Sequence, residues 1–246
     1  MQQPGHDQSS YGVRFDWGPT GASAVTADVA VVVDVLSFTT TLTVAVEKGI
    51  EVFPFRWRDG RAAEHALRHR ATLAVGRFEA LARSDARHVS LSPATLAKAE
   101  DVERLVLPSP NGSTIAFQLA EAGATVVGAC LRNASAVGRY VAGLGGSVVV
   151  IAAGERWDDD TLRPCAEDLW GAGAVLAALE PASRLSPEAR LAVAAYRDAD
   201  LPDDLHACAS GRELIDAGFV DDVTVAAELD SSDVVPVLRG ESFTAA

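Results

Sequence analysis

The sequence predicts an α/β fold of three layers, with helices on both faces of a mostly parallel sheet. Short β-branched runs alternate with Ala-rich stretches of helical length along most of the 246 residues, a rhythm typical of parallel sheets. The run Val29–Val33 is apolar without interruption, as expected for a strand covered on both faces. Hydrophobic residues make up 48% of the chain and supply a sizeable core.

Strands are expected where β-branched residues cluster, at Asp28–Val35, Ile50–Phe55, Thr72–Val75, Arg104–Leu107, Ala124–Ala129, Ser147–Ala152, Asp222–Val225 and Val234–Leu238. Helices are expected between them, at Thr39–Lys48, Gly60–Arg70, Ser113–Ala122, Asn133–Ala142, Cys165–Leu179, Pro187–Tyr196 and Ser210–Ala217. Asp59 is the expected N-cap of the second helix, and Gly49 and Gly123 sit where C-terminal caps belong. Ser92-Pro93 opens a brief helical turn.

This pattern divides the chain into an N-terminal tail with a first element, residues 1–27, and one α/β domain, residues 28–240. The β/α rhythm gives way to helices near Ser183, so a division into two closely packed lobes at that point stays open.

Composition excludes several classes of protein. The formal charge of −13 disfavours wide contact with nucleic acid or an anionic membrane, although local donors can still bind a small anion. No apolar run approaches the roughly 18 residues of a membrane span, and residues 1–10 are polar. Three widely spaced cysteines fit a reducing compartment. We therefore expect a cytoplasmic protein without nucleic-acid or membrane partners, and a homodimer on general grounds of symmetry.

The residues that follow each strand are the candidates for chemistry, because ligands of open α/β sheets bind at the carboxyl ends of strands. Asp34 ends the first expected strand, and Ser37, Thr39 and Thr40 follow it at a helix start suited to an anion. The alternative is that Asp34 only caps this helix.

A second segment, Pro108-Ser109-Pro110-Asn111-Gly112-Ser113, joins a strand to a helix. Ser109, Asn111, Gly112 and Ser113 offer hydroxyls and free amides to a phosphate, although Asn-Gly is also a common turn pair.

In a third segment, Arg132 could bind an anionic oxygen pair beside the N-cap residue Asn133. A surface arginine next to a capping Asn is an equally good interpretation.

A fourth segment runs from Gly154-Glu155-Arg156 to the adjacent acids Glu167 and Asp168. Carboxylates suit Mg²⁺, while acids near a helix N-terminus also serve as plain helix-stabilising residues. His65 and His69 are spaced as zinc ligands can be, but we expect a basic, solvated helix face there. The cysteines are expected to be small core residues.

In their order, these segments resemble the 2-phosphosulfolactate phosphatase family. The similarity includes Asp34-Val35-Leu36, Asn111-Gly112-Ser113, Asn133-Ala134, Glu167-Asp168 and Val235-Pro236-Val237, and extends over nearly the whole chain. The resemblance implies a Mg²⁺-dependent phosphoric monoester hydrolase acting on phosphate esters of short 2-hydroxy acids. The family's named substrate is (2R)-2-phospho-3-sulfolactate, which yields 3-sulfolactate and phosphate.

One departure from the family pattern concerns a residue expected to bind the anion. Where the family often has Arg-Ala after Asp-Val-Leu, this chain has Ser37-Phe38. A serine lacks the bidentate cationic contact of an arginine, and its loss costs roughly 1.5–3 kcal/mol of anion binding. Arg77, Arg132 and Arg156 are the candidates to compensate.

The resulting hypothesis places one Mg²⁺ on Asp34, Glu167 and Asp168, where it would activate a water. Asn111, Gly112 and Ser113 would steady the phosphate, and Arg156 with Arg132 would bind the second acidic group or stabilise the transition state. Asp34 could serve as a nucleophile instead of a ligand.

Other classes are less well supported. A haloacid-dehalogenase-type site would need a second acid at position 36, which is Leu36. A nucleotide-binding oxidoreductase would need a Gly-rich fingerprint that this chain lacks. A non-catalytic protein that binds a small anion remains the main alternative, and the Ser37 departure favours it.

Overall fold

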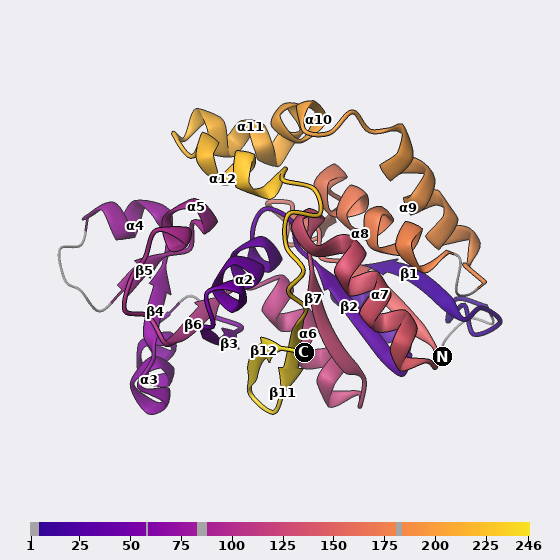
Figure 1. Cartoon of the computed structure of the whole chain (residues 1–246), viewed down its shortest axis with the longest axis horizontal. Helices are drawn as coiled ribbons and strands as arrows, with labels where there is room; N and C mark the ends of the chain where they lie inside the picture. The colour runs from indigo at the N-terminus through magenta and orange to yellow at the C-terminus, as the bar shows by residue number, and fades with distance from the viewer. Residues whose placement is uncertain (1–4, 58, 83–87, 181–183) are drawn as a thin grey trace.

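The computed structural model describes residues 5–57, 59–82, 88–180 and 184–246. Within these residues, ten strands form one sheet in the order β1-β8-β2-β7-β11-β12-β3-β6-β4-β5 (Figure 1). Their bounds are Val13–Trp17 (β1), Val29–Val33 (β2), Glu51–Phe55 (β3), Thr72–Val75 (β4), His88–Ser90 (β5), Arg104–Pro108 (β6), Thr125–Ala129 (β7), Val148–Ala152 (β8), Pro236–Arg239 (β11) and Ser242–Ala245 (β12). A separate hairpin pairs β9 (Glu155–Arg156) with β10 (Leu162–Arg163).

The sheet consists of two parallel halves. The first half contains β1, β8, β2 and β7, and the second half contains β3, β6, β4 and β5. The C-terminal hairpin β11–β12 joins them by antiparallel pairing, with Val237 opposite Val127 of β7 and Phe243 opposite Val52 of β3. The last segment of the chain therefore closes the seam between two units formed earlier in the sequence.

Helices cover both faces of the sheet, which confirms the predicted α/β class. Their bounds are Gly18–Ala24 (α1), Phe38–Glu47 (α2), Gly60–His69 (α3), Arg77–Ala82 (α4), Pro93–Ala97 (α5), Gly112–Glu121 (α6), Ala134–Leu144 (α7), Ala166–Leu179 (α8), Pro187–Asp198 (α9), Asp203–Ala207 (α10), Ala209–Asp216 (α11) and Val220–Ala226 (α12). Figure 1 shows α11 and α12 along the upper side of the molecule, between α4–α5 and α8. None of the helices in the described segments has the length and apolarity needed to cross a bilayer.

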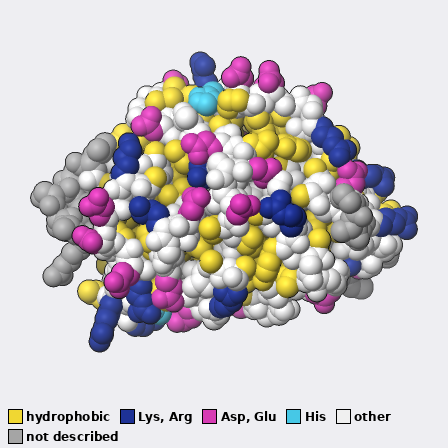
Figure 2. All heavy atoms as spheres, in the orientation of Figure 1, with side chains coloured by type: hydrophobic (Ala, Val, Ile, Leu, Met, Phe, Trp, Pro, Cys, Tyr) yellow, Lys and Arg dark blue, Asp and Glu magenta, His cyan; other side chains and the backbone are white. Residues whose placement is uncertain are grey.

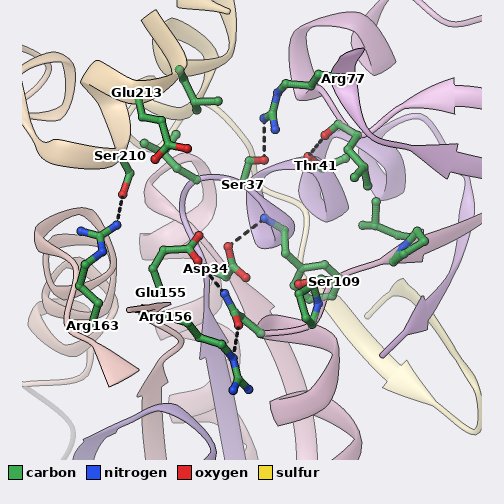
Figure 3. A pocket seen from close by; sticks show the side chains of 18 residues that line it. Asp34, Ser37, Thr41, Arg77, Ser109, Glu155, Arg156, Arg163, Ser210 and Glu213 are labelled. Atoms are coloured by element: carbon green, nitrogen blue, oxygen red, sulfur yellow. Dashed lines mark hydrogen bonds between the residues drawn. The ribbon is translucent and has the colours of Figure 1, made fainter. Parts of the chain in front are cut away.

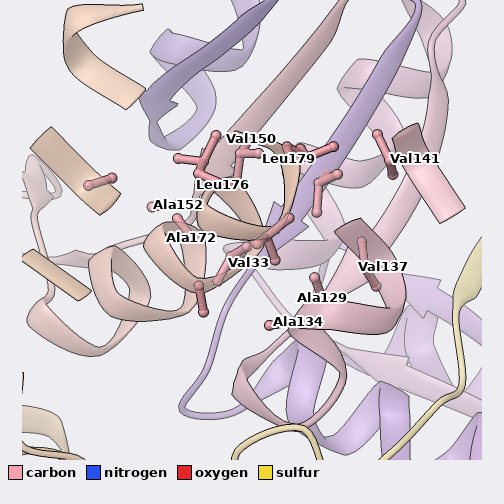
Figure 4. Packing of buried hydrophobic residues seen from close by; sticks show 14 of the residues in the cluster. Val33, Ala129, Ala134, Val137, Val141, Val150, Ala152, Ala172, Leu176 and Leu179 are labelled. Atoms are coloured by element: carbon pink, nitrogen blue, oxygen red, sulfur yellow. The ribbon is translucent and has the colours of Figure 1, made fainter. Parts of the chain in front are cut away.

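The strand β2 shows why its sequence is apolar throughout. Val31 and Val33 pack toward α7 and α8, against residues such as Leu176 (Figure 4), while Ala30 and Val32 pack on the opposite face toward α2 and α6. Successive side chains of a strand point to opposite faces, so both sets are excluded from water. Each buried side chain of the size of Val or Leu contributes roughly 1.5–3 kcal/mol.

Most expected elements are confirmed to within a few residues, and Asp59 accepts the amide of Arg61 (3.0 Å) as the N-cap of α3. The expected strand Asp222–Val225 is wrong, because these residues lie in α12. Acidic residues at the start of α12 favour a helix N-terminus, and that preference prevailed over the β-branched run. The lobe boundary near Ser183 falls outside the described residues. The first element of residues 1–27 includes β1, which pairs with β8 at the sheet edge.

The expectation of a solvated histidine face on α3 is also wrong. His65 is buried and stacks on Phe55, with ring centroids 4.7 Å apart, and His69 lies 4.1 Å from Phe53. The apolar face of α3 is therefore completed by two imidazoles that cover β3.

Candidate active site

A cavity of about 400 Å³ opens at the carboxyl ends of β2, β6 and β8. Its wall contains residues from both halves of the sheet and from α11 (Figure 3). The polar lining residues are Asp34, Ser37, Thr41, Arg77, Ser109, Asn111, Glu155, Arg156, Arg163, Ser210 and Glu213. This cavity lies where the strand-end rule placed the candidate chemistry.

Asp34 lies on the cavity wall between the N-termini of two helices. Its Oδ1 accepts a hydrogen bond from the amide of Phe38 in α2 (3.0 Å), and its Oδ2 accepts one from the amide of Gly112 in α6 (3.2 Å). Helix N-termini favour negative charge through their dipoles and unsatisfied amides. The two helices therefore fix the orientation of this buried carboxylate.

Gly112 is the contact point between the two halves of the sheet at the site. A Cβ at this position would lie 2.3 Å from Cδ1 of Phe38 and 2.8 Å from Oδ2 of Asp34. Because glycine has no side chain, the backbone at Gly112 can approach Asp34 this closely. The amide of Gly112 also donates to the hydroxyl of Ser109 (3.1 Å). Since this amide is directed at protein groups, its role differs from the phosphate cradle expected from the sequence.

Asn111 connects the second half of the sheet to the β9–β10 hairpin. Its Nδ2 donates to Oε2 of Glu155 (3.0 Å), and its Oδ1 accepts from Nε of Arg156 (3.4 Å). Arg163, on the other strand of the hairpin, donates to Ser210 of α11 (3.1 Å). The hairpin thus brings one acid and two arginines to the cavity.

Arg77, at the start of α4, enters the cavity from the second half of the sheet. Its Nη2 donates to the hydroxyl of Ser37 (2.8 Å). Its Nε pairs with Oδ2 of Asp222 in α12 (2.5 Å). From the sequence, Arg77 is one of three arginines considered as candidates to compensate for the departure at Ser37.

The predicted metal ligands do not gather as one set. Only Asp34 lines the cavity, whereas Asp168 lies behind it, with Oδ1 accepting the amide of Val35 (2.7 Å) and Oδ2 accepting the amide of Gly154 (2.8 Å). Burial, together with the nearby charges of Asp34 and Glu167, raises the pKa of Asp168 well above its usual range. Through its two hydrogen bonds to Val35 and Gly154, Asp168 joins the loop that carries Asp34 to the loop that carries Glu155.

Glu167 faces a different pocket, one that Cys208 of the α10–α11 junction also lines. Burial, with the charge of Glu167 beside it, raises the pKa of Cys208 to about 12. Across the residues that the structure describes, no three His, Cys, Asp or Glu side chains are grouped so as to hold a metal ion. Magnesium does not require such a group, since it is often held by one or two carboxylates with substrate phosphate and water.

Several predicted site residues serve the backbone instead of the cavity. The hydroxyl of Thr39 donates to the carbonyl of Asp34 and that of Thr40 to the carbonyl of Val35 (both 2.7 Å). The hydroxyl of Ser113 donates to the carbonyl of Leu107 (3.4 Å).

The third predicted segment, Arg132-Asn133, lies away from the cavity. Arg132 pairs with Glu228 and with Glu47 (3.3 Å), and Asn133 donates to the carbonyl of Val234 (2.9 Å). Both residues therefore attach the segment before β11 to the rest of the fold. Cys130, next to them, is fully buried, and burial raises the pKa of its thiol, in keeping with a core residue.

Sequence reasoning left several cavity residues out of the expected site. Glu155 belongs to the fourth candidate segment but received no role there, although it follows the end of β8 at Ala152 closely enough for the strand-end rule to include it. Arg163, Ser210 and Glu213 carry no local signal, because they reach the cavity only through the β9–β10 hairpin and the packing of α11.

Comparison with known proteins agrees with the resemblance in the sequence. The model of the 2-phosphosulpholactate phosphatase family matches residues 20–241. A probable 2-phosphosulfolactate phosphatase of Thermus thermophilus is 30% identical over 220 residues, which cover 87% of this chain and 89% of that protein. A second, from Symbiobacterium thermophilum, is 30% identical over 223 residues, which cover 88% and 93%. The matched region contains every strand-end segment of the cavity, and the chain belongs to the 2-phosphosulpholactate phosphatase family.

Proposed function

We propose that this chain is a Mg²⁺-dependent phosphatase that hydrolyses phosphate esters of short 2-hydroxy acids. The family and its named relatives support a phosphoric monoester hydrolase acting on 2-phosphosulfolactate. The observation that carries the proposal is the convergence of Asp34, Asn111 and Arg156 on one cavity at the strand ends.

The cavity suits a small substrate with more than one acidic group. Its volume of about 400 Å³ is at the lower end of the range for small-molecule sites. Arg77, Arg156 and Arg163 line it together with hydroxyl and amide groups. Guanidinium groups bind phosphate, sulfonate and carboxylate oxygens with two parallel hydrogen bonds. Such a lining supports (2R)-2-phospho-3-sulfolactate as a substrate.

Asp34 is the residue on which the chemistry depends. The amides of Phe38 and Gly112 hold its carboxylate in one orientation without a rearrangement during the reaction. In this position Asp34 acts either as a metal ligand or as the nucleophile toward phosphorus. Arg156, held beside Asn111, is placed to stabilise negative charge that develops on the phosphoryl oxygens.

Magnesium is part of the proposal, and the cavity carboxylates fit it. Asp34 and Glu155 are two carboxylates on the same cavity wall, which is the protein contribution that Mg²⁺ commonly uses. These residues would hold the ion in place of the expected set of Asp34, Glu167 and Asp168. When bound, Mg²⁺ supplies a positive charge that neutralises phosphoryl oxygens.

Release of inorganic phosphate tests the proposal. Purified protein is incubated with a panel of phosphorylated 2-hydroxy acids, with added Mg²⁺ or with EDTA. We expect release from 2-phospho-3-sulfolactate or a close analogue only with Mg²⁺. Tight binding of the panel without release would favour the non-catalytic anion-binding protein instead.

The substitution Asp34→Asn tests the residue that carries the mechanism. We expect phosphate release to fall roughly 1,000-fold or more, because loss of a residue that acts directly on the reacting group has effects of this size. Unchanged activity and unchanged Mg²⁺ affinity in the variant would remove Asp34 from the reaction.

A further inference from the structure

Arg77 and Ser37 meet at a place where the family pattern and this chain differ. Serine at position 37 cannot bind an anion with a cationic fork. Arg77, forty residues further along the chain, lines the same cavity and donates to the Ser37 hydroxyl (2.8 Å). A guanidinium group thus lies beside residue 37 although the residue itself carries no charge.

Tertiary contacts hold the Arg77 side chain in this position. Its Nε lies 2.5 Å from Oδ2 of Asp222, whose side chain is 1% exposed, while Arg77 itself is 17% exposed. The ring of Phe219 lies under the guanidinium, at 5.6 Å. Salt bridges of this kind restrict the geometry of a long side chain. Arg77 therefore presents a fixed group to the cavity.

Asp222 is itself held by other groups. Its Oδ1 accepts the hydroxyl of Ser92 and the amide of Ala94 (3.2 Å). An arginine has five N–H donors, and the contacts to Asp222 and Ser37 use two of them. Among the described residues, the hydrogen bonds of Arg77 to side chains are these two, so its other N–H groups can serve an anion that enters the cavity.

The place of Arg77 in the cavity indicates which part of a substrate it meets. In Figure 3, Ser37 lies between Arg77 and Asp34, so Arg77 is on the far side of Ser37 from the proposed reaction centre. An anion bound there is separate from the phosphoryl group near Asp34. Ser37 contributes a hydroxyl to the same region.

We infer that Arg77, with Ser37, binds the second acidic group of the substrate, a sulfonate or carboxylate, and so determines which phosphate esters this chain accepts. The inference rests on the proposed function for the position of the phosphoryl group. Arg77 of α4 makes the cationic contact to this group, and Asp222 of α12 holds Arg77 in place.

Kinetics of an arginine exchange tests this assignment. The variants are Arg77→Gln, Arg77→Lys and the double variant Arg77→Ser with Ser37→Arg. Arg197→Gln is the control, since Arg197 of α9 forms a surface ion pair with Glu180 at the end of α8 (2.6 Å). Each is assayed on two phosphate esters of equal size, one with an acidic group at the neighbouring carbon and one without it. Thermal unfolding of every variant checks that it is folded.

For Arg77→Gln we expect KM for the acidic ester to rise roughly 10- to 100-fold, the usual worth of a charge-assisted contact. KM for the neutral ester and kcat for both should change little, since the contact is made equally in ground and transition states. Arg77→Lys keeps the positive charge but loses the bidentate guanidinium contact. Its KM for the acidic ester should lie between the values of the parent protein and of Arg77→Gln. The double variant should regain most of the affinity, and Arg197→Gln should match the parent protein.

Equal KM values in Arg77→Gln and the parent, or an equal rise for both esters, would overturn the inference. Calorimetric titration with 3-sulfolactate separates this result from a failure of the proposed function. A protein that hydrolyses no ester but binds 3-sulfolactate through Arg77 would refute the phosphatase and keep the anion site. A parent protein without measurable affinity for 3-sulfolactate would refute the site.

Discussion

The two halves of the sheet contribute different groups to the cavity. The half with β2 and β8 supplies the carboxylates of Asp34 and Glu155, and the β9–β10 hairpin after β8 adds two arginines. The half with β6 and β4 is followed by Ser109, Asn111 and Arg77. Neither half therefore forms the site alone. The antiparallel hairpin β11–β12 fixes their relative position, so a C-terminal segment far from the chemistry determines the geometry of the cavity.

Figure 2 shows how charged side chains are distributed on one face of the molecule. On the face shown, basic side chains stand singly or in small groups among acidic ones. The face shown therefore carries mixed charge, and the gathering of Arg77, Arg156 and Arg163 beside carboxylates is a feature of the cavity.

The substitution Glu155→Gln tests the contribution of the first half. If Asp34 and Glu155 hold the metal, Glu155→Gln should weaken activation by Mg²⁺ roughly 10- to 100-fold, the range for disturbed metal sites. The matched substitution Glu167→Gln changes an acid that faces a different pocket and should have a much smaller effect. Titration of phosphate release with Mg²⁺ measures both. A larger effect at Glu167 would restore the ligand set expected from the sequence.

The substitution Gly112→Ala tests the junction of the halves. An added Cβ would clash with Phe38 and Asp34, so one of them must shift. We expect a loss of about 1–3 kcal/mol of unfolding free energy, as for other overpacked sites, and a fall in activity because the Asp34 carboxylate moves. Denaturant unfolding and kcat/KM are the measurements. Neither would change if α6 could withdraw freely from Asp34.

Arg132 and Arg77 are both largely buried arginines paired with acids, but only Arg77 of these two lines the cavity. Arg132 contacts Glu47 and Glu228 outside the cavity. Because both partners are partly exposed, we expect Arg132→Ser to cost only about 1–2 kcal/mol of stability. KM for the acidic ester should stay unchanged, and a rise would show that Arg132 belongs to the substrate site.

The smallest expected effect concerns pH and lies at α3, on the second half. Burial, with the neighbouring charge of His69, lowers the pKa of His65 below 6.5. His65 is then protonated more easily in the unfolded chain than in the folded protein. Its contribution to the stability of the folded state is present above pH about 6.5 and is lost as pH falls through the pKa of the folded state. Unfolding free energy measured from pH 7.5 to 5 should fall less in His65→Leu. An identical slope in both proteins would show that His65 does not titrate in this range.

Glu167 and Asp168 are neighbours in the sequence whose side chains point to different parts of the fold. Both were expected at one metal, yet consecutive residues of a helix point about 100° apart. Asp168 turns toward the loops after β2 and β8, and Glu167 turns toward α10 and α11. Adjacency along the chain therefore predicted a pair that helical geometry separates.

The alternation of strands and helices could be predicted from the amino-acid sequence, and with it the edge of the sheet at which Asp34 and Asn111 meet. These features follow from local pattern, since buried strands must be apolar and their carboxyl ends share one edge. Three features depend on how the chain packs: Arg77 lies beside Ser37, Arg163 donates to Ser210, and Asp222 belongs to a helix. These contacts join segments tens of residues apart, and their formation depends on how the two halves pack, which no local pattern encodes.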